Sequence, residues 1–342
     1  MNSMDRTFQV KRRRLWAGMV SLSAVAVIII TIALVRALTG AGPLSSEAGQ
    51  GNRPAALLDA LDAARKSLLT GQPAAANAVL VKLVEMYPRD REAHSLFAES
   101  LLELGEPAAA LIEYEKAIAI GPDFAELRFA AGSAANMASK PEIAEVHFLK
   151  AQDLDQASSQ YPLYLGTVQR NLGKIVEAQG SLLRAGNIDP ALAIAWGQLA
   201  YIALEENKLS LATTHIAKAR KLEPSSVHWR LIQARILKRQ NKPDKAASLL
   251  MAIETTDRLT NPMILREIGL CYGMLSRPED AADLFSEAVA MRPDDQQLLY
   301  ETALWHDRAE RQDLAMGFAQ RAAELGSERA VDLIKRLQSR DG

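Results

Sequence analysis

A repeat of 34 residues constrains the fold of this chain more than any other feature. The eight units begin at Leu57, Arg91, Ala125, Ser159, Ala193, Val227, Pro262 and Gln296. The twentieth residue is alanine in all eight: Ala76, Ala110, Ala144, Ala178, Ala212, Ala246, Ala281 and Ala315. The eighth residue is always alanine or glycine. Two helices approach closely only where side chains are small, so the period predicts eight helical hairpins.

Larger apolar residues and prolines follow the same period. The twenty-fourth position holds Leu80, Tyr114, Phe148, Leu182, Ile216, Leu250 and Phe285, with Ala319 in the last unit. Proline occupies the seventeenth position in five units, as Pro73, Pro107, Pro141, Pro243 and Pro278. Proline suits the first turn of a helix, where the N–H that it lacks would have no partner, so the second helix of each hairpin is predicted to begin there. Prolines also close five units, at Pro88, Pro122, Pro190, Pro224 and Pro293.

The pattern resembles the tetratricopeptide repeat (TPR) family over nearly all of residues 57–326, and its second unit matches best. That unit has Phe97, Ala98, Leu101, Gly105, Ala110, Tyr114, Ala117 and Pro122 at the signature positions. Gln156 and Arg258 depart from the closing proline, and Asn261 is one extra residue between units six and seven. The usual tryptophan at the fourth position occurs only as Trp196. The resemblance implies an all-α superhelix of helix-turn-helix repeats in a membrane-anchored, bacterial-type protein.

The predicted array spans residues 57–326 and is followed by a capping helix and tail at 327–342. Its repeats are 57–90, 91–124, 125–158, 159–192, 193–226, 227–260, 262–295 and 296–326. Ala330, Val331, Ile334 and Leu337 are predicted to form the apolar face of the capping helix, since they follow a helical spacing. The open end of a repeat array needs such a cap.

The N-terminal region carries the pattern of a membrane anchor. Residues 1–14 are basic, and an uncharged run of 21 residues from Leu15 to Val35 follows directly. A helix of that length spans roughly 30 Å, the thickness of the bilayer hydrocarbon. We therefore expect a single transmembrane helix over 15–38, a cytoplasmic segment at 1–14 and a flexible linker at 39–54.

The positive charges that precede the apolar run determine the expected topology. With the N-terminus in the cytoplasm, the array lies on the extracytoplasmic side of an inner membrane, which is the periplasm in a Gram-negative bacterium. The alternative is a cleaved signal peptide that releases a secreted periplasmic protein. The apolar run exceeds the usual length of a signal-peptide core, and no clear cleavage site follows it, so the sequence favours the anchor.

Charge and motif content exclude several functional classes. Residues beyond Arg36 hold 34 Lys and Arg against 40 Asp and Glu, which argues against nucleic-acid binding. Cys271 is the only cysteine, and the five histidines show no metal-ligand spacing. Phosphate-loop and serine-nucleophile motifs are absent from the sequence. We therefore predict no enzyme activity, cofactor, metal or small-molecule substrate.

In the family, positions 2, 5, 9, 12 and 13 of each repeat line a concave groove. In the first three repeats these positions include Leu58, Leu61, Leu68, Leu69, Glu92, Glu99, Glu103, Glu126, Phe129 and Met137. In repeats four to six they include Arg170, Asn171, Tyr201, His228, Leu231, Arg235, Lys238 and Arg239. The predicted groove is therefore apolar, then acidic, then basic.

We interpret Arg170, Asn171, Tyr201, Arg235, Lys238 and Arg239 as partner-binding residues, with the cations pairing carboxylates of the bound segment. The alternative is that these charges only solvate helix surfaces. Family members that bind acidic chaperone tails use a Lys/Asn clamp, and this chain has Leu61, Arg65 and Ser95 there.

The expected function is that of a membrane-tethered scaffold or chaperone-like adaptor for protein or peptide segments. Similar membrane-tethered arrays act in cell-envelope assembly, secretion, polysaccharide export and cytochrome maturation. A regulatory subunit of a membrane enzyme complex is the other reading, because fold alone does not choose among these roles.

Overall fold

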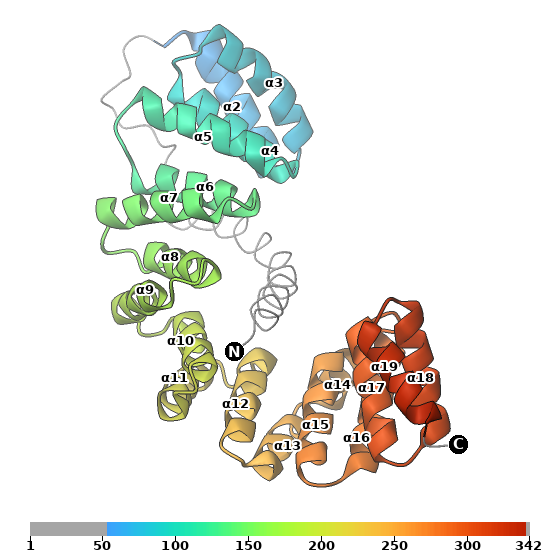
Figure 1. Ribbon diagram of the computed structural model, residues 1–342. Coiled ribbons are helices and arrows are strands. Elements are labelled where there is room, and N and C mark those ends of the chain that lie inside the picture. Colours follow the sequence, from blue (N-terminus) through green and yellow to red (C-terminus); the bar gives the residue numbers. More distant parts are fainter. Residues whose placement is uncertain (1–52, 340–342) are drawn as a thin grey trace. The chain divides into compact units, whose positions relative to one another are not determined.

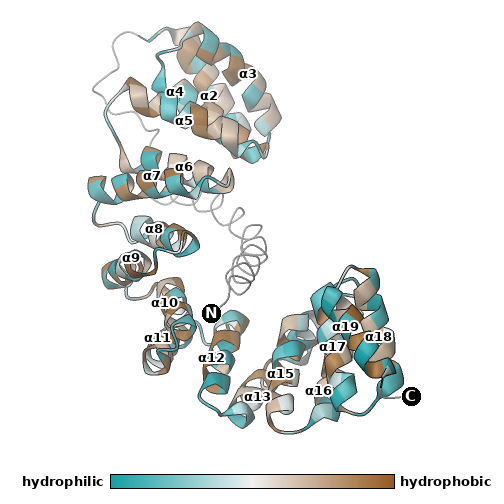
Figure 2. Cartoon of the chain, in the orientation of Figure 1, coloured by the Kyte–Doolittle hydropathy of each residue, from teal (hydrophilic) through white to brown (hydrophobic). Residues whose placement is uncertain are grey.

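The structure is a computed structural model that describes residues 53–339. The described residues contain helices and no strands, and they divide into two compact units, with the boundary in the sequence between Pro190 and Ala191. The all-helical class predicted from the sequence is therefore confirmed. The helices carry apolar and polar residues side by side, as the mixed colours of Figure 2 show, which is typical of amphipathic helices packed around a core.

The first unit is a series of antiparallel helical hairpins (Figure 1). Its helices are α2 (Ala55–Leu69), α3 (Pro73–Met86), α4 (Arg91–Glu103), α5 (Pro107–Ile120), α6 (Ala125–Met137), α7 (Pro141–Leu154), α8 (Gln160–Asn171) and α9 (Ile175–Ile188). Consecutive helices pack on one another, so each hairpin contacts the hairpins before and after it.

The second unit continues the same pattern with one interruption. Its helices are α10 (Ala193–Glu205), α11 (Leu209–Leu222), α12 (Val227–Arg239), α13 (Pro243–Met251), α14 (Thr255–Thr260), α15 (Pro262–Met274), α16 (Pro278–Met291), α17 (Gln296–Arg308), α18 (Gln312–Glu324) and α19 (Glu328–Gln338). In the sixth repeat the second helix stops at Met251, and the short α14 that follows has no buried residue. The extra residue, Asn261, accepts a hydrogen bond from the N–H of Met263 and caps α15.

Small residues close each hairpin as the period predicted. All eight alanines at the twentieth position are fully buried. In repeats three and seven, glycine at the eighth position makes room for the phenylalanine opposite it. A Cβ at Gly132 would lie 2.8 Å from the ring of Phe148, and one at Gly269 would lie 2.8 Å from that of Phe285. Normal carbon contacts are about 3.5–4.0 Å, so alanine would not fit at these positions.

The turn between the two helices of each hairpin places one residue in the left-handed region. Glycine provides this conformation in three hairpins, at Gly71, Gly105 and Gly173. The other five hairpins use Ser139, Asn207, Asn241, Ser276 and Glu310, with φ of 57–58°. Five of the second helices then begin at the predicted prolines.

Two tryptophans connect first helices of successive repeats in the second unit. A Cβ at Gly197 on α10 would lie 2.0 Å from Cζ3 of Trp229 on α12, and one at Gly273 on α15 would lie 2.0 Å from Cη2 of Trp305 on α17. Each indole therefore rests directly on glycine backbone. The period did not reveal these contacts, because neither glycine recurs at its position in other repeats.

The last helix, α19, packs through a face that differs from the predicted one. Ala330, Leu333 and Leu337 are buried, whereas Val331 is exposed. The prediction included Val331 and omitted Leu333, because a spacing of i, i+1 and i+4 permits two neighbouring stripes and only packing chooses between them. Leu333 and Leu337 cluster with Ala303, Ala315 and Ala319, whose helices α17 and α18 lie beneath.

The predicted cytoplasmic segment 1–14, the transmembrane helix 15–38 and most of the linker 39–54 lie outside the described residues. Within residues 53–339, none of the helices combines the length and apolar character that a membrane crossing requires.

Candidate partner-binding surface

The first helices of the repeats carry the predicted groove positions, and packing removes two of the predicted residues from that surface. Leu61 on α2 is buried in the core of the first hairpins. Phe129 on α6 is buried too, and its ring lies 5.0–5.5 Å from the rings of Phe148, Tyr161 and Tyr164. The interpretation of Leu61 and Phe129 as groove residues was wrong, because both fill space between helices.

The six predicted partner-binding residues divide between the two units. Arg170 and Asn171 lie at the end of α8 in the first unit, and Asn171 is exposed. Tyr201 lies on α10, and Arg235, Lys238 and Arg239 lie on α12 in the second unit. The structure brings Arg235 and Lys238 together, whereas Arg239 on the same helix is exposed to solvent. Whether these residues bind a partner stays a prediction.

A single carboxylate, that of Glu267 on α15, holds Arg235 and Lys238 in place. Nε of Arg235 donates to Oε1 of Glu267 at 2.8 Å, and Nζ of Lys238 donates to Oε2 at 2.5 Å. Glu267 is only 2% exposed, so the two cations are drawn onto a buried anion. This contact joins the first helices of repeats six and seven, next to the interrupted second helix of repeat six.

The same network extends to the eighth repeat. Arg266 on α15 lies 3.8 Å from Glu267 and donates two hydrogen bonds, of 2.5 and 2.7 Å, to Glu301 on α17. The set of Arg235, Lys238, Arg266, Glu267 and Glu301 has a formal charge of +1, and we call it the Glu267 cluster. Bidentate arginine–carboxylate pairs have fixed geometry, so the cluster holds its charges in a defined arrangement.

The cluster keeps Glu267 ionised in spite of its burial. Burial by itself raises the pKa of a carboxyl group, but Arg235, Lys238 and Arg266 outweigh it and leave the pKa of Glu267 below its ordinary value. Sequence reasoning missed Glu267, because nothing in a glutamate on a first helix signals that its side chain turns inward. The signal that existed was the pair Arg235 and Lys238, three residues apart on one helix face.

Acidic residues of the first unit are partly paired as well. Glu92 on α4 accepts from Arg53 at 2.8 Å and also pairs with Arg65, so it joins the first two repeats. Glu103 on the same helix is exposed, and burial together with the neighbouring Glu99 raises its pKa. The acidic stretch predicted for the groove therefore contains at least one residue with a structural role.

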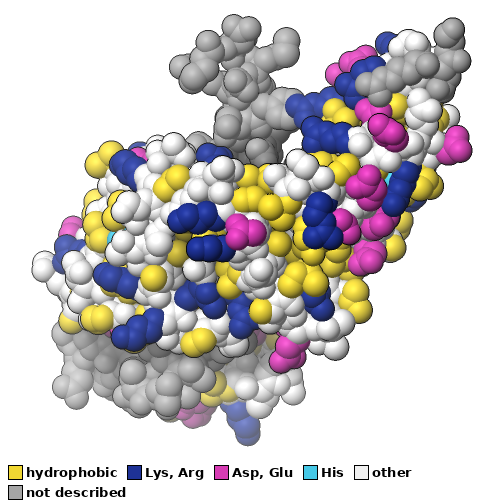
Figure 3. Space-filling model, turned by 90° about the horizontal axis from the view of Figure 1, so that it is seen from below, with side chains coloured by type: hydrophobic (Ala, Val, Ile, Leu, Met, Phe, Trp, Pro, Cys, Tyr) yellow, Lys and Arg dark blue, Asp and Glu magenta, His cyan; other side chains and the backbone are white. Residues whose placement is uncertain are grey.

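The face shown in Figure 3 has Lys and Arg side chains interspersed with apolar, neutral and acidic ones. Such a mixed surface offers local pairs of charges rather than one broad electrostatic field.

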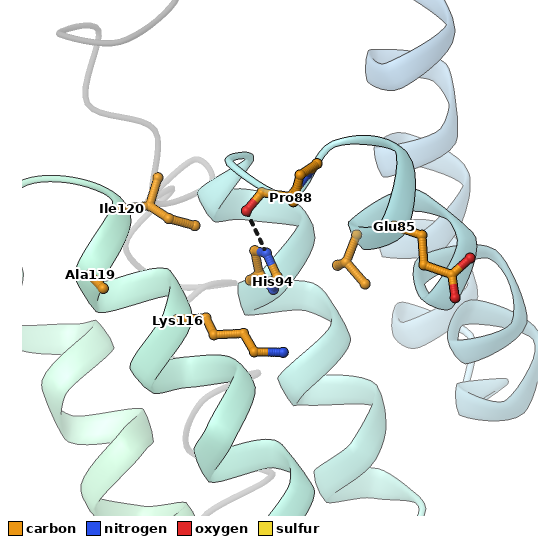
Figure 4. A pocket seen from close by; sticks show the side chains of 7 residues that line it. Glu85, Pro88, His94, Lys116, Ala119 and Ile120 are labelled. Carbon is orange, nitrogen blue, oxygen red and sulfur yellow. Dashed lines mark hydrogen bonds between the residues drawn. The ribbon is translucent and has the colours of Figure 1, made fainter.

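A depression of about 490 Å³ lies in the first unit between α3, α4 and α5 (Figure 4). His94 and Lys116 are among its lining residues, and both are already engaged. Nδ1 of His94 lies 2.6 Å from Glu113, its Nε2 lies 3.1 Å from the carbonyl oxygen of Pro88, and Lys116 donates to Glu113 at 2.7 Å. The polar groups here hold helices together.

Residues 53–339 offer few side chains that could bind a metal ion or act as a nucleophile. No cluster of three His, Cys, Asp or Glu residues able to hold a metal ion occurs there. Cys271 is buried, and burial raises the pKa of its thiol to about 11. A protonated, enclosed thiol is a poor nucleophile.

Two family models match this chain. The model of the N-terminal TPR repeats region of Psidin matches residues 199–315, and a tetratricopeptide repeat model matches residues 61–125. Among curated protein sequences, none matches significantly.

Solved structures share the fold at low sequence identity. A tetratricopeptide repeat protein from Parabacteroides merdae ATCC 43184 has a TM-score of 0.59 at 14% identity, with 72% of this chain and 96% of that chain covered. The APC/C hetero-tetramer Cut9–Hcn1 has a TM-score of 0.55 at 15% identity over 81% of this chain, which spans 55% of that chain. Yeast Tom70 has a TM-score of 0.54 at 20% identity, with 79% and 59% covered.

These structures share the stacked helical hairpins. The tetratricopeptide repeat model lies in the first unit and the Psidin model lies in the second. Together with the buried alanines that return with the 34-residue period, they identify the chain as a member of the tetratricopeptide repeat family.

Proposed function

We propose that this chain is a membrane-tethered scaffold that binds an acidic segment of a partner protein along the first helices of its second unit. Tetratricopeptide repeats act in protein–protein interaction, and the Glu267 cluster supports a site for carboxylates. It presents Arg235, Lys238 and Arg266 from two adjacent first helices, with Arg239 exposed beside them.

The observation that carries this proposal is the fixed geometry of the cations. A side chain held by Glu267 has already lost most of its rotational freedom, so less side-chain entropy is lost when a partner binds there. Tyr201, at the equivalent face of α10, is partly exposed and offers an aromatic surface to the same segment. In this proposal the protein acts by binding and catalyses no reaction.

The structure also determines which variant tests the proposal. Reversing Arg235 or Lys238 would place a new carboxylate beside the buried Glu267 and disturb the fold. Arg239 is exposed, so its charge can be reversed without touching that network.

We would place a photo-crosslinking residue at Tyr201 and identify the partner that it captures in cells. The same residue at Leu314 on α18, which is 50% exposed, is the control for a surface outside the site. We expect capture from position 201 and not from 314. Arg239→Glu should reduce capture from position 201 severalfold and Arg239→Lys should preserve it, because the partner's carboxylates need a cation. Full capture by folded Arg239→Glu would contradict the proposal.

The membrane tether rests on the sequence. The 21 uncharged residues from Leu15 to Val35 follow Lys11, Arg12, Arg13 and Arg14, which is the pattern of a single-pass anchor with a cytoplasmic N-terminus. We propose that the repeats lie on the extracytoplasmic side and serve a process of envelope assembly, secretion, polysaccharide export or cytochrome maturation.

A reporter fused after Gly342 that is active only outside the cytoplasm tests this topology. We expect activity from it and none from a matched cytoplasmic reporter, and the reverse result would contradict the topology. The intact mass of the purified chain separates anchor from cleaved signal. An anchored chain keeps its full 37.3 kDa, whereas a secreted one lacks its N-terminal residues.

A further inference from the structure

The outer face of the second helices differs between the two units. Positions 18, 19, 22 and 25 of each repeat point away from the first helices and are exposed or partly exposed in the first four repeats. There they are Ala74, Ala75, Ala78, Val81, Ala108, Ala109, Ile112, Glu115, Glu142, Ile143, Val146, Leu149, Val176, Glu177, Gly180 and Leu183. The last four repeats have Ser210, Leu211, Thr214, Ala217, Asp244, Lys245, Ser248, Met251, Glu279, Asp280, Asp283, Ser286, Asp313, Leu314, Gly317 and Gln320. The first set is mainly apolar and the second mainly polar.

Large side chains in the first unit stand out into solvent on this face. Ile112 on α5 is 52% exposed, Val146 on α7 is 63% exposed and Val176 on α9 is 77% exposed. Ile143 and Leu149 on α7 and Leu183 on α9 are exposed as well. Single exposed apolar residues are ordinary, but a contiguous set marks an interaction surface.

Two side-chain contacts show that the three helices are neighbours. Nε2 of His147 on α7 lies 3.8 Å from Oε1 of Glu115 on α5. Lys174, the residue before α9, donates to Glu145 on α7 at 2.6 Å. The helices α5, α7 and α9, which follow one another in the first unit (Figure 1), therefore form one continuous surface, here called the outer strip.

Charges on α7 show what the outer strip fits. Lys140 and Glu142 lie before its exposed apolar residues, and Lys150 and Asp153 lie after them. Among the exposed charges, a plus and a minus precede the apolar residues and a plus and a minus follow them, centred near Val146. Glu145, which lies between them, is half-buried and paired with Lys174. When such a helix meets an antiparallel copy of itself, Glu142 faces Lys150 of the copy and Lys140 lies near Asp153 of the copy. A pattern that is complementary to itself after a half-turn is what a two-fold symmetric contact requires.

We propose that the outer strip binds a second copy of this chain, with α7 antiparallel to α7 of the copy and the two-fold axis near Val146. The half-turn places α5 of each copy over α9 of the other, where Glu115 lies opposite Glu177, so the attractive charge pairs of this contact are those of α7. Ile112 then meets a surface where Gly180 leaves room between Val176 and Leu183, since no atom lies within 4 Å of a Cβ at Gly180.

The area agrees with a reversible dimer. Helices of 14 residues are about 21 Å long, and neighbouring helices lie about 10 Å apart, so three of them present roughly 600 Å² per copy. The total of roughly 1,200 Å² is at the lower limit of stable interfaces, so we expect a dimer that dissociates on dilution.

Charge reversal with rescue tests the register. The full-length chain is examined by light scattering over a dilution series, in detergent whose mass is subtracted. Wild type should shift from twice 37.3 kDa to 37.3 kDa on dilution. Each single variant, Glu142→Lys or Lys150→Glu, brings like charges together twice per dimer and should weaken the affinity of the dimer about tenfold. The double variant Glu142→Lys/Lys150→Glu should restore an affinity close to that of wild type.

Three results would overturn the proposal: a mass of 37.3 kDa at every concentration, single variants that associate like wild type, or a double variant that fails to recover. Recovery of the dimer by the double variant would be decisive, because exchanging two charges within one chain would not restore binding of the outer strip to a membrane or to an unrelated protein.

Cysteine crosslinking supplies a second, geometric test. Val146→Cys places two thiols beside the two-fold axis and should give a covalent dimer under mild oxidation. The only natural cysteine, Cys271, is buried, so wild type serves as the blank. Leu314→Cys on α18 is the matched control, since Leu314 is also an exposed outer residue of a second helix. Equal crosslinking from positions 146 and 314, or none from 146, would also refute the contact.

Discussion

The same substitution, glycine to alanine, should have opposite effects at two helical positions of the second unit. In the interior of a helix, alanine is favoured over glycine by about 0.5–1 kcal/mol, because glycine loses more backbone entropy on folding. At Gly317 on α18 a Cβ meets no atom within 4 Å, so only this gain applies. Gly317→Ala should therefore stabilise the protein by about 0.5–1 kcal/mol.

At Gly197 on α10 the added Cβ collides with an immobile ring. It would lie 2.0, 2.3 and 2.7 Å from three carbons of Trp229, where about 3.5–4.0 Å is normal. Trp229 is buried, and its Nε1 donates to Glu223 at 2.6 Å, so the indole has little freedom to move away. Overpacking of this kind costs about 3 kcal/mol at its upper range, which leaves Gly197→Ala destabilised by about 2 kcal/mol after the helical gain.

Urea unfolding followed by far-ultraviolet circular dichroism, together with thermal midpoints, measures the contrast. The two variants should differ by about 3 kcal/mol, which corresponds to roughly 6–12 °C for a unit of this size. The variant Trp229→Leu supplies the control, because removing the ring should eliminate most of the cost of Gly197→Ala in a double-mutant cycle. If Gly197→Ala were as stable as Gly317→Ala, the close packing of tryptophan on glycine would be refuted.

Further predictions concern the Glu267 cluster, the thiol, the histidines and the turns. Glu267→Gln should destabilise the protein by about 2–3 kcal/mol, since Arg235 and Lys238 lose their buried anion. Because the folded-state pKa of Glu267 is lowered, wild type should lose this advantage only as the pH falls below about 4.3, and urea titrations at pH 7 and pH 3.5 should show the gap narrowing. A thiol reagent at pH 8 should leave native Cys271 unlabelled and label it rapidly after unfolding, because the raised pKa of about 11 and burial both suppress attack. Glu310→Gly should raise the thermal midpoint by a few degrees, since it relieves a left-handed backbone at φ 58°. Burial lowers the pKa of His147, His215 and His306 and so favours their neutral form in the folded state. The free energy of unfolding should therefore fall as the pH drops from 7 to 5, and it should fall less steeply when the three histidines are replaced by glutamine.

The sequence by itself determined the class of the fold. Alanine at the twentieth position of each repeat, and alanine or glycine at the eighth, predict helices that pack closely in pairs. All eight alanines at the twentieth position are buried, which confirms this reason. A period of 34 residues is local information repeated along the chain, so it can be read without knowing which distant residues meet. The prolines that begin the second helices are local in the same sense.

Tertiary packing alone decided the surface on which a partner is proposed to bind. Phe129 has the helical position of a groove residue, but neighbouring rings cover it, and Glu267 turns into the interior, where three cations keep it charged. Whether a side chain points to solvent or to the next repeat depends on residues about 30 positions away, such as Lys238 for Glu267. A repeat pattern states which positions are equivalent. It does not state what each position meets in the following repeat, because that contact is made only when the helices stack.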